Sequence, residues 1–185
     1  MLLQALREEV LEANLELVRR GLVLYTFGNT SGFSRQDQLV AIKPSGVPYK
    51  TMKPKDLVVT DLHGKIVEGN LKASSDLPTH LVLYKAFPEI GGATHTHSEY
   101  ATAWAEAHRP ISCLGTTHAD SCHGPVPVTA DMTDREIASA YEKNTGDAIV
   151  RTFERADWRG SCRPGIEPRS LHVGARMQRS PHVMQ

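Results

Sequence analysis

The chain has 185 residues, of which 40% are apolar and 23% charged, and this composition is typical of one soluble globular domain with a hydrophobic core. Its formal net charge is zero, so the overall charge does not indicate binding to nucleic acid or to an anionic membrane. No apolar run approaches the ~20 residues of a membrane-spanning helix, and the first residues are interrupted by Glu and Arg, unlike a signal peptide.

In chain order, the apolar residues recur first at helical and then at strand spacing. The sequence predicts helices over residues 2–20, 77–87, 99–107 and 133–143. It predicts strands over residues 22–27, 39–43, 56–62, 65–69, 92–97, 111–115 and 125–129. Tight turns are expected at GNTSG (28–32), at Pro44-Ser45-Gly46 and at His63-Gly64, where a β-hairpin should form. The chain is therefore expected to be an α/β layered domain with a largely antiparallel sheet.

The run Thr94-His95-Thr96-His97 is the sharpest chemical feature of the sequence. On a strand, positions i and i+2 face the same side and start roughly 6.6 Å apart. Two imidazoles so placed can converge on one metal ion at ~2.0–2.1 Å. The alternative is a pair of ordinary histidines. Asp76 lies in a polar turn where a helix should begin, and an acidic oxygen beside two imidazoles is a common donor set for a divalent metal.

Three turns combine small polar donors with tight backbone geometry, which suits an anion such as phosphate. They are Gly28-Asn29, then Lys43 with Ser45-Gly46, and Ser74-Ser75 at the expected start of a helix, where anions are favoured. Each alone reads more readily as a routine surface turn. Asp120, in the run His118-Ala119-Asp120, could act as a general acid or base or could simply form a turn.

Six motifs, in this order, resemble the L-ribulose-5-phosphate 4-epimerases of the class II sugar-phosphate aldolase and epimerase superfamily: GNTSG, IKPSGV, SSDLPTH, GATHTHS, TTHAD and MTDREI. The resemblance covers residues 1 to about 154. It implies a three-layer αβα fold, a homotetramer with sites at subunit interfaces, and a Zn2+ ion, or another divalent cation such as Mn2+, held by histidines. The three cysteines have no metal-type spacing, and their odd number argues against a disulfide scaffold, so a reducing cytoplasm is the expected setting.

The same resemblance implies a role for each matching residue. The metal would be held by Asp76, His95 and His97, and relatives that are aldolases carry Glu at the Asp76 position. Asp120 would be an acid/base reaching into the neighbouring subunit's site, with Thr116 and Glu142 as supporting polar residues at that interface. The phosphate would be bound by Gly28, Asn29, Lys43, Ser45, Gly46, Ser74 and Ser75.

The implied activity is the interconversion of L-ribulose 5-phosphate and D-xylulose 5-phosphate by retro-aldol cleavage and re-formation of the C3–C4 bond, in arabinose or ascorbate-type catabolism. The partner is a small phosphorylated sugar, not a nucleic acid or a membrane. Two alternatives stay open: a class II aldolase of the L-fuculose-1-phosphate type, and an inactive truncated pseudoenzyme like the superfamily's cytoskeletal relatives. The retained His95 and His97 argue against an evolved scaffold role.

Residues 155–185 differ in kind from the rest, with six arginines and no lysine against two acidic residues, a net charge of about +4 beside about −4 for residues 1–154. After Ile166 the family continues with His-Gly-Pro-Phe-Thr-Trp-Gly, whose His is a third metal ligand. Codons exist for residues 167–174 that spell this motif when read one base later. We therefore expect an incomplete domain over residues 1–154 and a tail that is out of frame after about residue 166. A substitute ligand at His172 and a basic nucleic-acid-binding arm are the alternatives.

Overall fold

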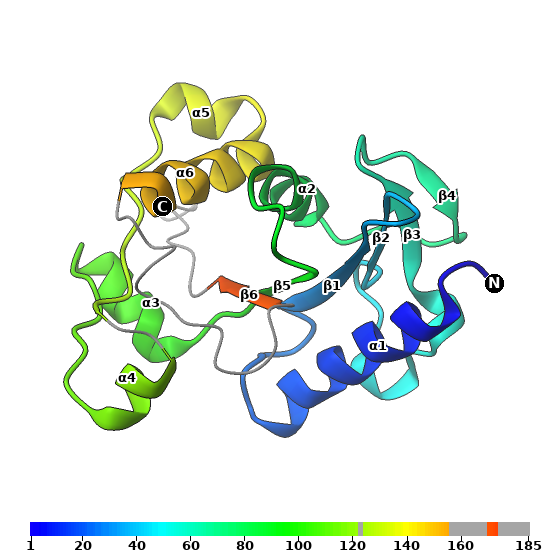
Figure 1. Ribbon diagram of the computed structural model, residues 1–185, viewed down its shortest axis with the longest axis horizontal. Helices are drawn as coiled ribbons and strands as arrows, with labels where there is room; N and C mark the ends of the chain where they lie inside the picture. The colour runs from blue at the N-terminus through cyan, green and yellow to red at the C-terminus, as the bar shows by residue number, and fades with distance from the viewer. Residues whose placement is uncertain (122–123, 156–169, 174–185) are drawn as a thin grey trace, which may run out of the picture.

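A computed structural model describes residues 1–121, 124–155 and 170–173, and within them one six-stranded sheet runs through the centre of the molecule (Figure 1). The strand order is β4-β3-β2-β1-β5-β6, and every neighbouring pair is antiparallel except β5 and β6. The strands are β1 (Asn29–Ser34), β2 (Leu39–Ile42), β3 (Val58–Asp61), β4 (Ile66–Glu68), β5 (Gly92–His95) and β6 (Ser170–Val173).

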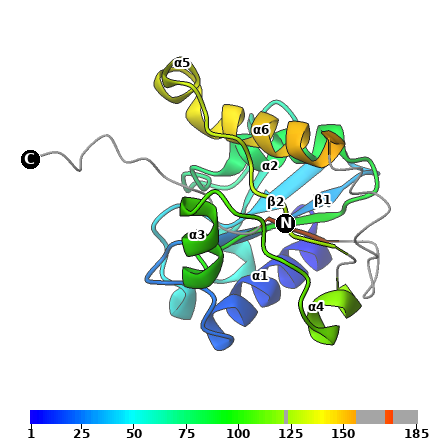
Figure 2. The ribbon, with the colours of Figure 1, turned by 90° about the vertical axis from the view of Figure 1, so that its left-hand side faces the viewer.

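Helices cover both faces of this sheet, so the expected three-layer αβα arrangement is confirmed (Figures 1 and 2). Helix α1 (Gln4–Arg19) lies against one face, and helices α2 (Leu77–Ala86) and α6 (Tyr141–Arg155) pack on each other against the opposite face. The remaining helices are α3 (Glu99–Glu106), α4 (Thr116–Ser121) and α5 (Asp134–Ala138). Short 3-10 turns, Tyr49–Thr51 and Pro54–Asp56, lie beside α1.

Alternation along the strands divides the core into two apolar clusters, one for each face. Val40, Ile42 and Val58 belong to the cluster under α2 and α6. Ala41 and Val59, their immediate neighbours in sequence, belong to the cluster under α1. Because both faces are covered, these strands are almost fully apolar.

Polar side chains fix α1 to the sheet and to the segment that follows β2. The Arg7 guanidinium is fully buried and donates to the carbonyls of Leu2 and Leu57 and to the carboxylate of Glu68, at 2.9, 2.6 and 2.8 Å. Asn14 is also fully buried, and its amide exchanges hydrogen bonds with the backbone of Thr30 at 2.9 and 3.0 Å. The first turn and the middle of α1 are therefore anchored by buried polar groups that satisfy one another's hydrogen bonds.

The predicted strand over residues 22–27 is wrong, and the predicted GNTSG turn is in fact most of β1. Most apolar residues of that segment are solvent-exposed, with Leu24 at 60% and Tyr25 at 88% exposure, and Val23 is partly buried. The polar residues Asn29 and Ser31 are buried instead, at 2% and 1%. The strand forms because each of these polar side chains finds a hydrogen-bond partner on a neighbouring element.

Three other expected elements differ from the structure. Residues 111–115 and 125–129 are not strands but meet in a single bridge between Ile111 and Val126. The capping box of Thr133 and Glu136 is confirmed, but the helix that it opens ends at Ala138 and α6 begins anew at Tyr141. Strand β6 and helix α4 were not expected. Within the described part of the chain, no helix has the length and apolar character needed to cross a membrane.

Candidate active site

One cavity of about 420 Å³ opens where β1 begins, β5 ends and α2 starts. Its lining includes eleven of the thirteen residues that the sequence analysis singled out. They are Gly28, Asn29, Lys43, Ser45, Gly46, Ser74, Ser75, Asp76, His95, His97 and Glu142. Segments far apart in the sequence therefore meet at this corner of the sheet.

Asp76 occupies the N-cap position of α2, but its side chain makes no capping hydrogen bond. Its carboxylate oxygen Oδ2 instead accepts hydrogen bonds from Asn29 Nδ2 at 2.7 Å and from His95 Nδ1 at 3.0 Å. Asn29 and His95 face each other across the antiparallel β1–β5 pair. The carboxylate thus closes a triangle with the side chains of both strands.

The environment of Asp76 keeps its carboxyl group ionised. Burial opposes the charge, but the hydrogen bond from His95, the electrostatic attraction of the His95 and His80 rings, and the hydrogen bond from Asn29 outweigh it. The pKa of Asp76 therefore lies well below its usual range. The buried ring of His80 shows the opposite preference: burial lowers its pKa to about 4, against the attraction of Asp76, and keeps the ring neutral.

His95 lines the cavity, and its two ring nitrogens differ in their hydrogen bonding. An ionised carboxylate can only accept, so the His95 Nδ1 facing Asp76 must carry a proton. In the neutral ring Nε2 then holds a lone pair, and this buried atom has no hydrogen-bond partner among the described residues. The His97 ring lies 4.7 Å away, centroid to centroid. A carboxylate that orients an imidazole through Nδ1 while Nε2 stays open is a common arrangement at metal sites.

These residues fit a divalent metal at the side of the cavity where the imidazoles lie, with His95 and His97 as nitrogen ligands. Within the described residues, no three His, Cys, Asp or Glu side chains are already gathered as a complete ligand set. The family's third histidine was predicted to be lost after residue 166, in a stretch that lies mostly outside the described residues. Of the proposed substitute, His172, only the backbone is described, paired in register with Thr94.

The cavity lining also includes the ammonium group of Lys43 and serine hydroxyls, of which the Ser74 hydroxyl accepts from Asn29 Nδ2 at 3.2 Å and donates to Asp76 Oδ2 at 3.5 Å. Lys43 is only 2% exposed, its Nζ lies 4.7 Å from the centre of the Tyr49 ring, and burial lowers its pKa while Asp76 raises it. The backbone amides of Ser45 and Ser74 donate to the carbonyls of Lys72 and Lys43, so they are not available to an anion. The donors that suit an anion here are therefore the lysine and the hydroxyls.

Thr116 and Asp120 do not line this cavity; both are exposed on α4. Glu142 does line it, from the first turn of α6, whereas the sequence analysis had placed Glu142 with Thr116 at a subunit interface. Sequence reasoning missed Phe27, whose ring centroid is 5.9 Å from that of His97. Thr26 and Pro44 were also missed; the neighbouring glycines were the only signal for them.

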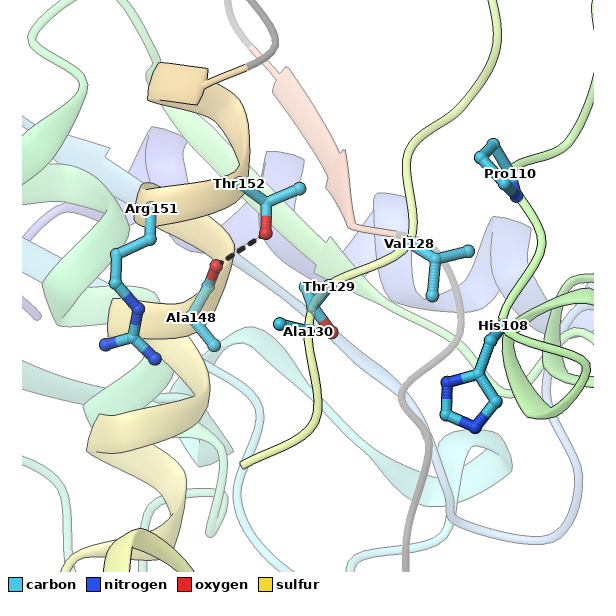
Figure 3. A pocket seen from close by; sticks show the side chains of 8 residues that line it. All are labelled: His108, Pro110, Val128, Thr129, Ala130, Ala148, Arg151 and Thr152. Carbon is cyan, nitrogen blue, oxygen red and sulfur yellow. Dashed lines mark hydrogen bonds between the residues drawn. The ribbon is translucent and has the colours of Figure 1, made fainter. Parts of the chain in front are cut away.

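A second cavity, of about 470 Å³, lies between α6 and the segment that precedes α5 (Figure 3). Its two basic side chains, His108 and Arg151, lie at opposite sides and do not converge (Figure 3). Arg151 is already paired with the carboxylate of Glu136 at 3.1 Å. This cavity therefore lacks a cluster of groups that could perform chemistry.

Comparison with known proteins gives consistent results. Residues 8–160 match the family described as the class II aldolase and adducin N-terminal domain. An L-fuculose 1-phosphate aldolase is 30% identical, with a TM-score of 0.66 over 77% of this chain and 68% of that protein. YgbL from Klebsiella pneumoniae, a putative aldolase/epimerase/decarboxylase, is 25% identical, with a TM-score of 0.64 over 80% of this chain and 72% of that protein. The L-fuculose-1-phosphate aldolase of Thermus thermophilus, at 24% identity and a TM-score of 0.63 over 81% of this chain and 74% of that protein, shares the fold.

Proposed function

Since the chain belongs to the class II aldolase and adducin family, we propose that it is a metal-dependent epimerase that interconverts L-ribulose 5-phosphate and D-xylulose 5-phosphate. One observation carries the proposal. The residues that line one cavity include an imidazole whose Nε2 has no partner among the described residues, the ionised carboxylate that bonds its Nδ1, and a buried ammonium. A ketose that bears a phosphate needs both kinds of partner.

On the metal side, His95 and His97 would hold Zn2+ or Mn2+, with Asp76 beside them. A divalent cation there supplies Lewis-acid polarisation of the ketose oxygens. Asn29 and Asp76 fix the His95 ring, so Nε2 is already oriented before any ligand arrives. Preorganisation of this kind lowers the reorganisation that binding and reaction would otherwise require.

On the anion side, Lys43 with the hydroxyls of Ser45, Ser74 and Ser75 would hold the phosphate. Inversion at C4 requires the C3–C4 bond to break, the resulting aldehyde to turn over, and the bond to form again on its other face. The phosphate remains attached to the turning fragment, so a firm grip on it keeps the aldehyde in the cavity.

The C4 hydroxyl must lose its proton as the bond breaks and regain one when the bond forms again, from the opposite side. Glu142 lines the cavity and is one candidate for this proton transfer. Asp120, exposed on α4, would serve the site of a neighbouring copy in a homotetramer. Each site would then take His95 from one copy and Asp120 from its neighbour. Mixed oligomers of Asp120→Asn and His95→Asn chains should therefore recover activity that neither variant has alone, because some sites would contain both intact residues.

A class II aldolase of the L-fuculose-1-phosphate type is the second candidate, favoured by the 30% identity to such an enzyme. Both candidate enzymes break a carbon–carbon bond of the sugar, but the aldolase releases the two fragments and the epimerase joins them again. Net release of dihydroxyacetone phosphate and an aldehyde from L-fuculose 1-phosphate would indicate the aldolase. Formation of D-xylulose 5-phosphate from L-ribulose 5-phosphate, without net cleavage, would indicate the epimerase.

The deciding experiment is a pair of coupled assays on the 185-residue chain, with Zn2+ or Mn2+ and each substrate in turn. His97→Asn is the matched control, since it should abolish either activity. No product from either substrate, together with no specific uptake of zinc or manganese, would refute both enzymes and favour a pseudoenzyme. Sequencing the gene past the codon for Ile166 tests the proposed change of reading frame, which codons incompatible with the shifted motif would exclude.

A further inference from the structure

Three buried side chains, those of Ser31, His80 and Tyr84, form a hydrogen-bonded network that joins β1 to α2. Ser31 Oγ lies 2.6 Å from His80 Nδ1 and 2.7 Å from Tyr84 Oη, and all three residues are at most 2% exposed. The backbone of Ala93, on β5, also hydrogen-bonds to the Tyr84 phenol. This network therefore connects α2 to β1, which begins at the cavity, and to β5, which ends there.

The position of each member relates the network to the site. Ser31 follows Asn29 by two residues and so lies on the same face of β1, and Ala93 precedes His95 by two on β5. His80 follows Asp76 by four residues, one turn along α2. The buried network thus involves the same three elements as the Asn29, Asp76 and His95 side chains in the cavity. Its members lie two residues away along each strand and one turn away along α2.

Three polar side chains in an otherwise apolar layer constrain how α2 can be placed against the sheet. The surrounding cluster contains Phe33, whose ring centroid is 5.0 Å from that of Tyr84. Apolar side chains would pack there without any requirement for direction, whereas a satisfied hydrogen-bond network allows one relative placement of its elements. The network therefore fixes where α2 lies along β1 and β5.

We propose that Ser31, His80 and Tyr84 form a positioning network that sets the Asp76 carboxylate against Asn29 and His95, and that it thereby determines the affinity for a divalent cation. The proposal rests on the proposed function in that the cation is the ligand concerned. Metal and catalytic groups must be held within about 0.5 Å of their working geometry. Removing a partner that supports a ligand weakens metal binding by about 10–100-fold.

Cobalt titration of the full chain, followed by the visible absorption of bound Co2+, tests the proposal. Ser31→Ala should weaken cobalt binding by about 10-fold, the lower end of the range for a direct partner of a ligand, because Ser31 acts through α2 and Asp76. Tyr84→Phe should weaken it less, since the Ser31–His80 bond would remain. Thr30→Val is the matched control, because it removes the 3.1 Å hydroxyl contact to Thr94 between the same two strands on the opposite face. Equal cobalt affinity in Ser31→Ala and Thr30→Val would overturn the proposal.

A metal-free readout separates this proposal from the proposed function. Long-range 1H–15N correlation spectra in EDTA report which nitrogen of His95 is protonated. The unsubstituted protein and Thr30→Val should show His95 protonated at Nδ1. Ser31→Ala should show a mixture of tautomers, because the hydrogen bond between His95 Nδ1 and Asp76 loses its geometry. If the parent takes up no cobalt, the proposed function fails, and an unchanged tautomer in Ser31→Ala then overturns the positioning role as well. Should Ser31→Ala not fold, Tyr84→Phe answers both measurements.

Discussion

Replacement of Gly28 by alanine should damage the site through close contacts of the new methyl group, above all with the backbone of His95, and Gly46→Ala is the comparison. Both glycines line the cavity and both have positive φ, +90° and +70°. A Cβ on Gly28 would lie 2.9 Å from the His95 carbonyl oxygen and 2.8 Å from Val23 Cγ1, whereas a Cβ on Gly46 would meet nothing within 4 Å. The positive φ costs about 1 kcal/mol in each variant. The contact with a backbone atom adds about 1–3 kcal/mol at Gly28 alone.

Urea unfolding of the metal-free variants measures this difference. Gly46→Ala should lose about 1 kcal/mol and Gly28→Ala about 2–4 kcal/mol. The effect of alanine on the unfolded chain is common to both variants and cancels in the comparison. Gly28→Ala should also weaken cobalt binding, because the peptide between His95 and Thr96 has to move away from the new methyl group. Equal losses in the two variants would show that the contact with His95 has no energetic effect.

Three further changes have defined outcomes. Arg7→Met should lower the unfolding free energy by about 3–5 kcal/mol in urea, because it leaves buried carbonyls and Glu68 without their partner; Glu68→Gln should cost much less. The folded state holds the pKa of Asp76 below its unfolded value, so the unfolding free energy of the metal-free protein should decrease as the pH falls below about 4. Asp76→Asn should reduce this decrease. His80 has a folded pKa of about 4 against 6.5, so the unfolded state binds more protons between these values. Stability should therefore fall by roughly 3 kcal/mol as the pH drops from 7 to 4, and this loss should be absent in His80→Gln.

Local patterns in the sequence predicted the parts of the site that depend on near neighbours. His95 and His97 were placed together by strand periodicity alone, and their rings are adjacent even though β5 ends at His95. The hairpin at His63-Gly64 follows from the positive φ that glycine accepts, +84° here. The capping box of Thr133 likewise depends only on a residue three positions away.

Features set by distant partners could not be predicted in this way. The sequence of β1 has no apolar alternation. Its backbone pairs with β2 and β5, and Asn14, Asp76 and His80 supply hydrogen-bond partners for its buried polar groups from other elements. Asp76 has a typical N-cap residue type at an N-cap position, yet its carboxylate turns to Asn29 and His95. Local hydrogen bonding and tertiary contacts compete for such side chains, and the sequence does not reveal which one prevails.

The polarity of β1 has a structural cause that links the fold to the cavity. Alternate residues of the strand serve opposite layers: Asn29 and Ser31 reach the α2 side, while Gly32 allows α1 to approach, with Leu6 Cδ1 only 2.7 Å from the position of a Cβ. Valines at positions 29 and 31 could pack between the sheet and α2, but they could not present an amide to Asp76 or a hydroxyl to His80. The hydrophobic clusters on either side carry the stability of the domain, and β1 can therefore be polar where the cavity requires it. Apolar substitution on the Asn29 face should thus disturb the cavity more than the fold.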